Sequence, residues 1–389
     1  MKKIKVAISQ RIIPHYRVPV FTELSERKDI DLTVFYGKGF KSGASANAEK
    51  IDGFKHVKLF TIFLSFLNRY NKQLIVFHPF LIFRLLFGNF DVIIVEPTTN
   101  IFNDLIIFPY CKLFKRKFIW YEAGAVPENE RTANRKFMDP IVNRMTKKAD
   151  AYITYNSFAD KYLMEYLNIP KEKIFRAQNA LDTKEIFAAI EKFSGSIDKK
   201  KAELELSDCK VALFIGGIEK RKRINNLISA IANINKAGIK AKTLIVGDGF
   251  DIQWIKSHMT ADELECTIFA GKHIADAVLY ILVSDVVVLP GQGGLSINHA
   301  YACKKPFIGT RESVSPDTDS IYDYVTDDLN GYVININDIA ALTEKLKIIF
   351  TQSDLYGKLC AGAFETSKVI DVPNMVDGIE NAVKFVCQK

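Results

Sequence analysis

Short apolar runs alternate with longer amphipathic stretches along the chain. The runs have the length and composition of buried strands, and they fall into two series. The first series comprises residues 4–9, 32–36, 56–60, 92–96, 118–121, 151–155 and 174–177. The second comprises residues 211–215, 243–246, 267–269, 285–289, 306–308 and 331–334. Helical patterns separate most of these runs, so the sequence predicts an α/β protein with parallel sheets covered on both faces.

One polar stretch lies between the two series. Residues 191–201 combine glycine and serine with a run of lysines, a composition typical of a domain boundary or a surface loop. Each series is long enough to form a doubly wound, Rossmann-like sheet with its own core. We therefore predict two such domains, residues 1–190 and 205–370, with a ligand cleft between them.

The composition is that of a globular protein. The chain has 389 residues, of which 48% are hydrophobic and 25% charged, and these proportions exclude the disordered and fibrous classes. The six cysteines are scattered without a Cys-x-x-Cys pair, so neither a zinc site nor a disulfide framework is predicted. The apolar stretch at the start is too short for a signal peptide. We expect reduced thiols and a cytoplasmic protein.

The formal net charge of +8 suggests an anionic partner. Nucleic acid, anionic lipid and a phosphorylated small molecule would all satisfy it. The sequence has no RNA-recognition signature, zinc-finger spacing or helix-turn-helix pattern, so only the sign of the charge favours nucleic acid. We do not predict a nucleic-acid partner.

Residues 59–87 are unusually rich in Phe, Leu and Ile. Basic residues and a proline interrupt the stretch, so it is not a membrane-spanning helix. One interpretation is a strand followed by a buried helix. The other is an apolar and basic face that contacts an anionic membrane surface.

The segment 290–308 is the most informative motif. It follows the apolar run 285–289, and its glycines lead into a helix predicted to begin near Leu295, whose N–H groups would face a bound anion. Ser296 and His299 lie three residues apart, near enough to serve one face of its first turn. The segment therefore predicts a phosphate site at the carboxyl end of a sheet.

A related arrangement opens the second series. The run 211–215 leads into Gly216 and Gly217, a basic cluster and a helix, and this combination suits a diphosphate. Residues 244–250 and 269–271 then end two further strands in glycine turns. In this order and spacing, the motifs resemble the nucleotide-sugar-binding domain of the retaining glycosyltransferases of family 4, which have the two-domain GT-B fold.

The resemblance covers essentially the whole chain. Residues 10–21 are similar to the first strand-to-helix loop of that family, and residues 178–182 to its Asn-x-x-Asp junction. Residues 371–389 include a segment similar to the last helix, which crosses back to the first domain. The resemblance implies a GT-B fold for the chain.

The resemblance also implies which residues bind the donor: Gly216, Gly217, Arg221, Lys222, Gly293, Gly294, Leu295, Ser296 and His299. Lys222 would neutralise the diphosphate as its bond to the sugar breaks. The alternative interpretations are non-functional. Lys222 would be a solvated lysine, His299 a structural histidine, and the glycine segments tight structural turns.

The chain departs from the family at three positions. The arginine of the family's Gly-Arg-Leu is missing at Gly217, and Arg221 is one of the nearby cations that could replace it. Gly291 and His299 stand where many members have acidic residues. His299 could still hydrogen-bond a ribose hydroxyl or a phosphate.

Three residues are candidates for catalysis or acceptor binding in the first domain. His15 follows the first strand, and Glu96 and Glu122 end two later ones, so all should lie at the carboxyl edge of the sheet. A carboxylate there can act as a base or hold a sugar hydroxyl. A surface histidine and surface charges would give the same pattern.

The leading hypothesis is a glycosyltransferase that moves a sugar from a nucleotide-diphosphate sugar to a saccharide or lipid-linked saccharide, with retained configuration, in the synthesis of a cell-surface polysaccharide or glycoconjugate. The family implies no essential metal or other cofactor, and no Asp-x-Asp motif directly follows a predicted strand. Work at the inner face of the cytoplasmic membrane would fit the apolar and basic stretch. The alternatives are a GT-B protein that only binds sugar nucleotides, and a nucleotide-sugar epimerase.

Overall fold

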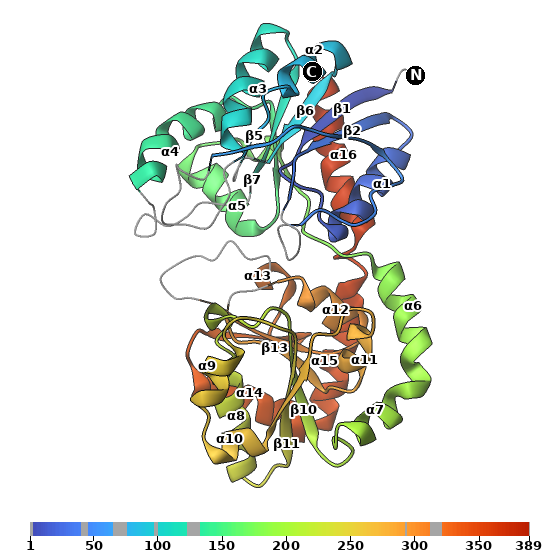
Figure 1. Cartoon of the computed structure of the whole chain (residues 1–389), viewed down its shortest axis with the longest axis vertical. Coiled ribbons are helices and arrows are strands. Elements are labelled where there is room, and N and C mark those ends of the chain that lie inside the picture. Colours follow the sequence, from blue (N-terminus) through green and yellow to red (C-terminus); the bar gives the residue numbers. More distant parts are fainter. Residues whose placement is uncertain are drawn as a thin grey trace. The chain divides into compact units, whose positions relative to one another are not determined.

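The computed structural model describes residues 3–39, 46–64, 76–96, 100–122, 133–291, 294–311 and 321–388. The chain divides into two compact units (Figure 1). The first comprises Met1–Asn179 and Val372–Lys389, and the second comprises Ala180–Asp371. Each unit has its own parallel sheet, so the predicted α/β class with two Rossmann-like bodies is confirmed.

Seven strands form the sheet of the first unit within the described residues, in the order β3-β2-β1-β6-β7-β8-β9. They are β1 (Ile4–Ser9), β2 (Ile30–Tyr36), β3 (Lys55–Lys58), β6 (Val92–Val95), β7 (Lys117–Glu122), β8 (Ala151–Thr154) and β9 (Ile174–Arg176). All neighbours are parallel, and each strand coincides with an apolar run of the first series. Val92–Val95 and Ala151–Thr154 are buried throughout, as expected for strands covered on both faces.

Helices cover both faces of this sheet: α1 (Val18–Glu26), α2 (Leu81–Gly88), α3 (Ile101–Leu113), α4 (Ala133–Thr146), α5 (Ser157–Lys161) and α16 (Val372–Gln388). The last helix, α16, red in Figure 1, lies against α1 and against strands β7 to β9. A Cβ on Gly378 would lie 2.1 Å from the carbonyl oxygen of Arg176, so this glycine lets α16 approach the end of β9. An ion pair between Arg27 and Asp377, at 2.8 Å, links α1 to α16.

The stretch 59–87 differs from the buried-helix interpretation. A short antiparallel pair, β4 (Ile62–Phe63) and β5 (Val76–Phe77), precedes α2, and the sequence analysis does not predict it. Helix α2 buries Leu81 and Leu85 but leaves Phe87 87% exposed. The helix is apolar on both faces, so composition alone could not show that only one of them is buried.

Six strands form the sheet of the second unit within the described residues, in the order β12-β11-β10-β13-β14-β15. They are β10 (Lys210–Ile215), β11 (Ala241–Val246), β12 (Thr267–Gly271), β13 (Val286–Leu289), β14 (Phe307–Arg311) and β15 (Gly331–Asn335). All pairs are parallel and match the second series of apolar runs.

The helices of the second unit show where the chain divides. They are α6 (Thr183–Phe193), α7 (Ile197–Glu203), α8 (Ile224–Lys236), α9 (Ile252–Ser257), α10 (Ala261–Glu265), α11 (Ala277–Leu282), α12 (Ser296–Ala302), α13 (Ile321–Tyr324), α14 (Ile339–Thr351) and α15 (Ser353–Ser367). Because α6 packs on α11 and α12, the division falls after Asn179 and not after residue 190. The polar stretch 191–201 is largely helical, and its charges face solvent or pair locally, as Lys200 does with Glu203.

No helix within the described ranges is both long enough and apolar enough to cross a bilayer.

Helix α3 carries a buried carboxyl group. Asp104 is fully buried, and neither carboxylate oxygen has a hydrogen-bond partner among the described residues. Burial, with a further contribution from the charge of Glu96, raises the pKa of Asp104 well above its usual range. The shift favours the protonated, neutral form of the carboxyl group.

Asp104→Asn tests this assignment. The folded-state pKa is raised, so the folded protein holds a proton that the unfolded chain releases above about pH 4. Wild-type stability should then fall relative to Asp104→Asn as pH rises from 5 to 8, by up to about 1.4 kcal/mol per pH unit. Urea unfolding followed by the fluorescence of buried Trp120, in a Trp254→Phe background, measures the difference. A difference that stays constant with pH would show that Asp104 is ionised.

Candidate functional site

Glycine turns meet at the carboxyl edge of the second sheet. Gly216 follows β10, and Gly247, with φ of +150°, follows β11. A Cβ on Gly247 would lie 1.9 Å from the carbonyl oxygen of Gly216, so only glycine permits this contact. The Gly216 N–H donates to the Val246 carbonyl at 3.0 Å and joins the same two turns. The position of the loop after β10 is therefore set by backbone contacts.

A cavity of about 200 Å³ opens beside these turns. The lining residues are Phe214, Ile215, Gly216, Gly217, Lys222, Leu289, Gly294, Leu295 and Ser296. They come from the ends of β10 and β13 and the loops that follow them. Strand β10 lies between β11 and β13, so the chain leaves it to one side and later returns on the other. Open α/β sheets bind ligands at the carboxyl end of strands at such a switch point.

The structure brings most of the predicted donor-binding residues into this one cavity. Gly216, Gly217, Lys222, Gly294, Leu295 and Ser296 line it. Gly293 lies outside the described residues. The sequence analysis does not predict Phe214, Ile215 and Leu289 as site residues, although they are the last residues of neighbouring strands.

Arg221 is not among the described residues that line the cavity. Its Nε donates to Glu219 Oε2 at 2.5 Å, and the side chain is 56% exposed. The hydrogen bond with Glu219 raises the pKa of Arg221, and the same bond lowers the pKa of Glu219. The guanidinium thus pairs with the carboxylate two residues earlier in the chain.

Gly291 is required by a second close approach. A Cβ at this position would lie 2.2 Å from the Arg221 carbonyl oxygen and 2.6 Å from the Lys222 carbonyl carbon. Any side chain, including a carboxylate, would displace the loop that carries Lys222. The backbone packing of this chain therefore favours glycine at position 291.

Helix α12 starts at the cavity. Leu295 is its N-cap without a side-chain hydrogen bond, and Ser296 is its first residue. Ile297 and Tyr301 of α12 are buried. Asn298 Nδ2 donates a hydrogen bond to the Ile370 carbonyl at 3.1 Å. The predicted helix start is confirmed. His299 lies half-buried on α12 and is not among the described lining residues.

A different site lies at the carboxyl edge of the first sheet. Strands β1, β6, β7 and β8 are successive neighbours, so the residues that follow them lie along one edge. Tyr155, after β8, donates from its hydroxyl to Glu96 Oε1 at 2.6 Å. Arg17 Nη2 donates to the same hydroxyl at 2.5 Å. Glu96, Tyr155 and Arg17 form one hydrogen-bonded chain.

Arg17 is a buried cation enclosed by aromatic rings. It is 5% exposed, and its guanidinium carbon lies 5.2 Å from the Tyr155 ring centre and 5.8 Å from that of Tyr121. Burial alone would lower the pKa of Arg17, but Tyr155, Tyr121 and Glu96 together hold it well above its ordinary value. Burial raises the pKa of Tyr121 to about 12. The site therefore contains a fixed positive charge beside neutral phenols.

The other predicted residues of the first domain have different outcomes. His15 is exposed, in the short 3-10 helix His15–Arg17, and its ring meets Tyr16 edge-on at 5.6 Å. Glu122 is the last residue of β7, and its side chain lies outside the described residues. The sequence analysis does not predict Arg17 or Tyr155 as site residues. Their signals were a basic residue in the first loop and a polar aromatic at a strand end.

Comparison with known proteins finds a family match in the second unit. Residues 196–364 match the family model described as "Glycosyl transferases group 1", which covers most of the second unit and somewhat less than half of the chain. The chain is a glycosyltransferase. No curated protein matches its sequence significantly.

Solved structures share the fold of this glycosyltransferase over its whole length. Alr3699/HepE from Anabaena, in complex with UDP, has a TM-score of 0.73 and 14% identity and covers 99% of this chain and 100% of its own. A glycosyltransferase from Rickettsia africae has a TM-score of 0.71, 15% identity and full coverage of both chains. Sucrose-phosphate synthase from Thermosynechococcus elongatus has a TM-score of 0.69 and 14% identity and covers 99% of this chain and 100% of its own. The glycosyltransferase thus has the GT-B fold.

Gly291→Ala should destabilise the second unit, because its Cβ would overlap the Arg221–Lys222 backbone. We expect a cost of about 1–3 kcal/mol, typical of overpacking a tight contact. Gly294→Ala is the matched control, since nothing lies within 4 Å of its Cβ position. Thermal unfolding of both variants makes the comparison. Equal midpoints for the two would contradict the role given to Gly291.

Tyr155→Phe should destabilise the first unit more than Tyr152→Phe does. Both lose one buried hydroxyl, but Tyr152 donates to the neutral Thr146 carbonyl, whereas Tyr155 joins the charged Arg17 and Glu96. The expected costs are about 1 kcal/mol for Tyr152→Phe and about 2–3 kcal/mol for Tyr155→Phe. Urea unfolding measures both. A smaller loss for Tyr155→Phe would show that the three residues are not coupled.

Proposed function

We propose that this glycosyltransferase takes its sugar from a nucleoside diphosphate sugar held in the cavity of the second unit. The observation that carries the proposal is that Lys222, the Gly216–Gly217 turn and Ser296 line one cavity of about 200 Å³ at the switch point of the sheet. A diphosphate needs a cation and hydrogen-bond donors at the same oxygens, and this cavity has both.

Related folds support the choice of donor. Structures of Anabaena Alr3699/HepE are of complexes with UDP, with UDP and glucose, and with UDP-glucose. The pneumococcal O-GlcNAc transferase GtfA, with a TM-score of 0.65 and 11% identity, is a complex with UDP and GlcNAc. UDP-sugars are therefore the first donors to test on this chain.

The reaction we propose depends on charge stabilisation of the leaving group. The bond between the anomeric carbon and the diphosphate oxygen breaks, and the electron pair stays with the oxygen. The acceptor oxygen bonds to the anomeric carbon and its hydroxyl proton passes to a base, for which Glu96 is the candidate. The Lys222 ammonium stabilises the negative charge that develops on the diphosphate. Because this cation and the backbone N–H groups supply the stabilisation, we propose that the reaction needs no metal ion.

The first unit would hold the acceptor. We propose a saccharide or lipid-linked saccharide, transfer with retained configuration, and a role in cell-surface polysaccharide or glycoconjugate synthesis at the inner face of the cytoplasmic membrane. Glu96 is half-buried and is oriented by Tyr155, so its carboxylate can accept a hydrogen bond from a sugar hydroxyl or take its proton. His15, exposed beside the same edge, is the second candidate for acceptor contact.

A second candidate function is sugar-nucleotide binding without transfer. The observation that favours it is Arg221, which pairs with Glu219 and leaves Lys222 as the cation among the described lining residues of the cavity. A protein of this kind would bind donors and would release no nucleoside diphosphate.

Lys222→Ala tests the proposed function. Release of nucleoside diphosphate from a panel of nucleotide sugars should fall about 100-fold or more, as when one group that stabilises transition-state charge is removed. Arg221→Gln should have a much smaller effect, because its side chain pairs with Glu219. EDTA should leave the rate unchanged.

Each other outcome has a definite meaning. Turnover that Lys222→Ala does not change would refute the site assignment. Donor binding without turnover by the wild type, with every acceptor tried, would favour the binding-only function. Loss of activity with EDTA, restored by a divalent cation, would refute metal independence.

A further inference from the structure

Helix α2 carries an apolar stripe that the core does not cover. Phe80, at its N-cap, Phe83 and Phe87 are spaced by three and four residues, and they are 56%, 53% and 87% exposed. The opposite stripe, Leu81 and Leu85, is buried. This spacing places the three phenylalanines on one face of the helix, directed to solvent.

Helix α3 repeats the arrangement. Ile106 and Leu113 are 39% and 76% exposed, and Pro109 between them is exposed as well. Ile107 and Tyr110 face the core and are buried. Two successive helices therefore each have an outer apolar stripe in addition to the inner stripe that packs on the sheet.

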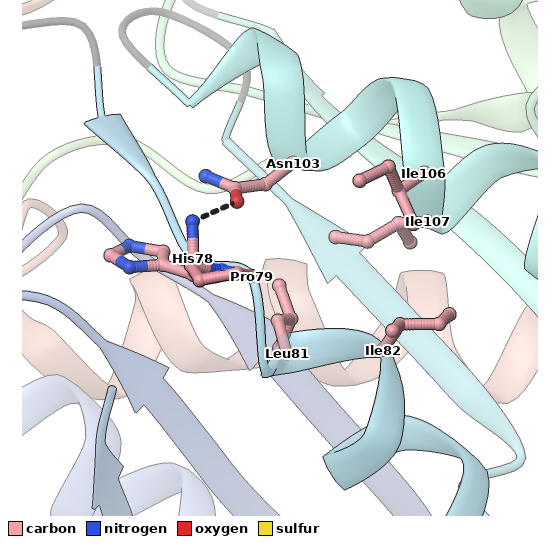
Figure 2. Close-up of a pocket in the computed structure, with 7 residues that line it drawn as sticks. All are labelled: His78, Pro79, Leu81, Ile82, Asn103, Ile106 and Ile107. Carbon is pink, nitrogen blue, oxygen red and sulfur yellow. Dashed lines mark hydrogen bonds between the residues drawn. The ribbon is translucent and has the colours of Figure 1, made fainter. Parts of the chain in front are cut away.

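The two stripes belong to adjacent elements of one surface. Leu81 and Ile82 of α2 lie opposite Ile106 and Ile107 of α3 around a cavity of about 10 Å³, which is room for about one water molecule (Figure 2). The helices are thus packed together, and the Tyr110 hydroxyl donates to the Leu85 carbonyl at 3.0 Å.

Further aromatic residues extend this surface. The Phe60 ring, 63% exposed, lies 6.2 Å from that of Phe80, and Phe114 follows α3 at 46% exposure. We call the whole set the α2–α3 face: Phe60, Phe80, Phe83, Phe87, Ile106, Leu113 and Phe114. Exposed apolar patches of this kind mark interaction sites.

The exposed charges on α2, on α3 and directly after α3 are basic. Arg84, Lys112 and Lys115 are exposed among its apolar residues, although Lys112 also lies 3.8 Å from Asp150. Across the described residues 80–96 and 100–117, the acidic residues Asp91 and Glu96 are half-buried, and Asp104 is fully buried. This surface therefore suits a partner that offers an apolar interior to the phenylalanines and anionic groups to the surrounding Arg and Lys side chains.

We propose that the α2–α3 face binds an anionic lipid bilayer, with its phenylalanines and leucine inserted at the level of the headgroups. Helices that lie in a membrane interface combine an aromatic and aliphatic face with flanking Lys and Arg, which contact anionic headgroups. The inference rests on the proposed function in one respect, since a lipid-linked acceptor gives the enzyme a reason to be at the bilayer. The inference adds that the α2–α3 face is the surface that binds the bilayer.

The test is co-sedimentation of the full chain with vesicles of phosphatidylglycerol and phosphatidylcholine. Phe83→Ser/Phe87→Ser should weaken vesicle binding at least about tenfold, since two exposed aromatic anchors are lost. The matched control is Phe250→Ser, which replaces a phenylalanine of the second unit that is fully exposed, at 103%. It should bind vesicles as the wild type does.

A charge variant tests the rim. Arg84→Gln/Lys115→Gln should reduce binding about fivefold for each cation removed, and the effect should disappear on pure phosphatidylcholine. Lys358→Gln, an exposed lysine of α15, is its control and should change nothing.

Other outcomes overturn the proposal. It fails if the wild type does not bind the vesicles, or if Phe250→Ser weakens binding as much as Phe83→Ser/Phe87→Ser. A wild-type dimer that Phe83→Ser/Phe87→Ser dissociates, without vesicle binding, would show that the face binds a second copy of the chain. Release of nucleoside diphosphate in vesicle-free solution should be equal in wild type and Phe83→Ser/Phe87→Ser. If it is absent in both while vesicles bind, the proposed function fails and the docking surface stands.

Discussion

Contact between backbones, without intervening side chains, determines the geometry of the cavity in the second unit. The turn after β11 touches the turn after β10 at Gly247, and the loop after β13 touches the Lys222 segment at Gly291. Each contact leaves no room for a Cβ, so the position of Lys222 depends on glycines that have no chemistry of their own. These contacts position the loops that line the cavity that we assign to the diphosphate. The glycine at position 291 then follows from packing.

The first unit contains a buried charge, the guanidinium of Arg17. Arg17 has almost no access to water, and its charge is balanced by Glu96 through the Tyr155 hydroxyl and by the faces of aromatic rings. Breaking such a network leaves an uncompensated charge, so its members are expected to act as a unit. Nearby, Asp104 has no such partner among the described residues, and burial raises its pKa instead. Of these two carboxylates, Glu96 is the one that we propose for acceptor contact, because it is half-buried and hydrogen-bonded to Tyr155.

The apolar pattern predicts the two sheets well, because strands buried on both faces must be continuous apolar runs. It misses β4 and β5, which are two residues each and too short to give a pattern. It also places the division between units late, since the contacts of α6 with α11 and α12 are not local in sequence. Family motifs predict the cavity residues, but they do not show that Arg221 faces Glu219 or that Arg17 meets Tyr155 across the unit. Side-chain direction and long-range pairing depend on packing.

The central claim is that the cavity beside Lys222 binds the diphosphate of the donor. Calorimetric titration of the full chain with UDP and with uridine, at low and high salt, tests it most directly. The account predicts that UDP binds at least about tenfold more tightly than uridine, and that this advantage shrinks as salt screens the interaction with the lysine. Equal affinities for UDP and uridine, unchanged by salt, in a protein that binds both, would contradict it.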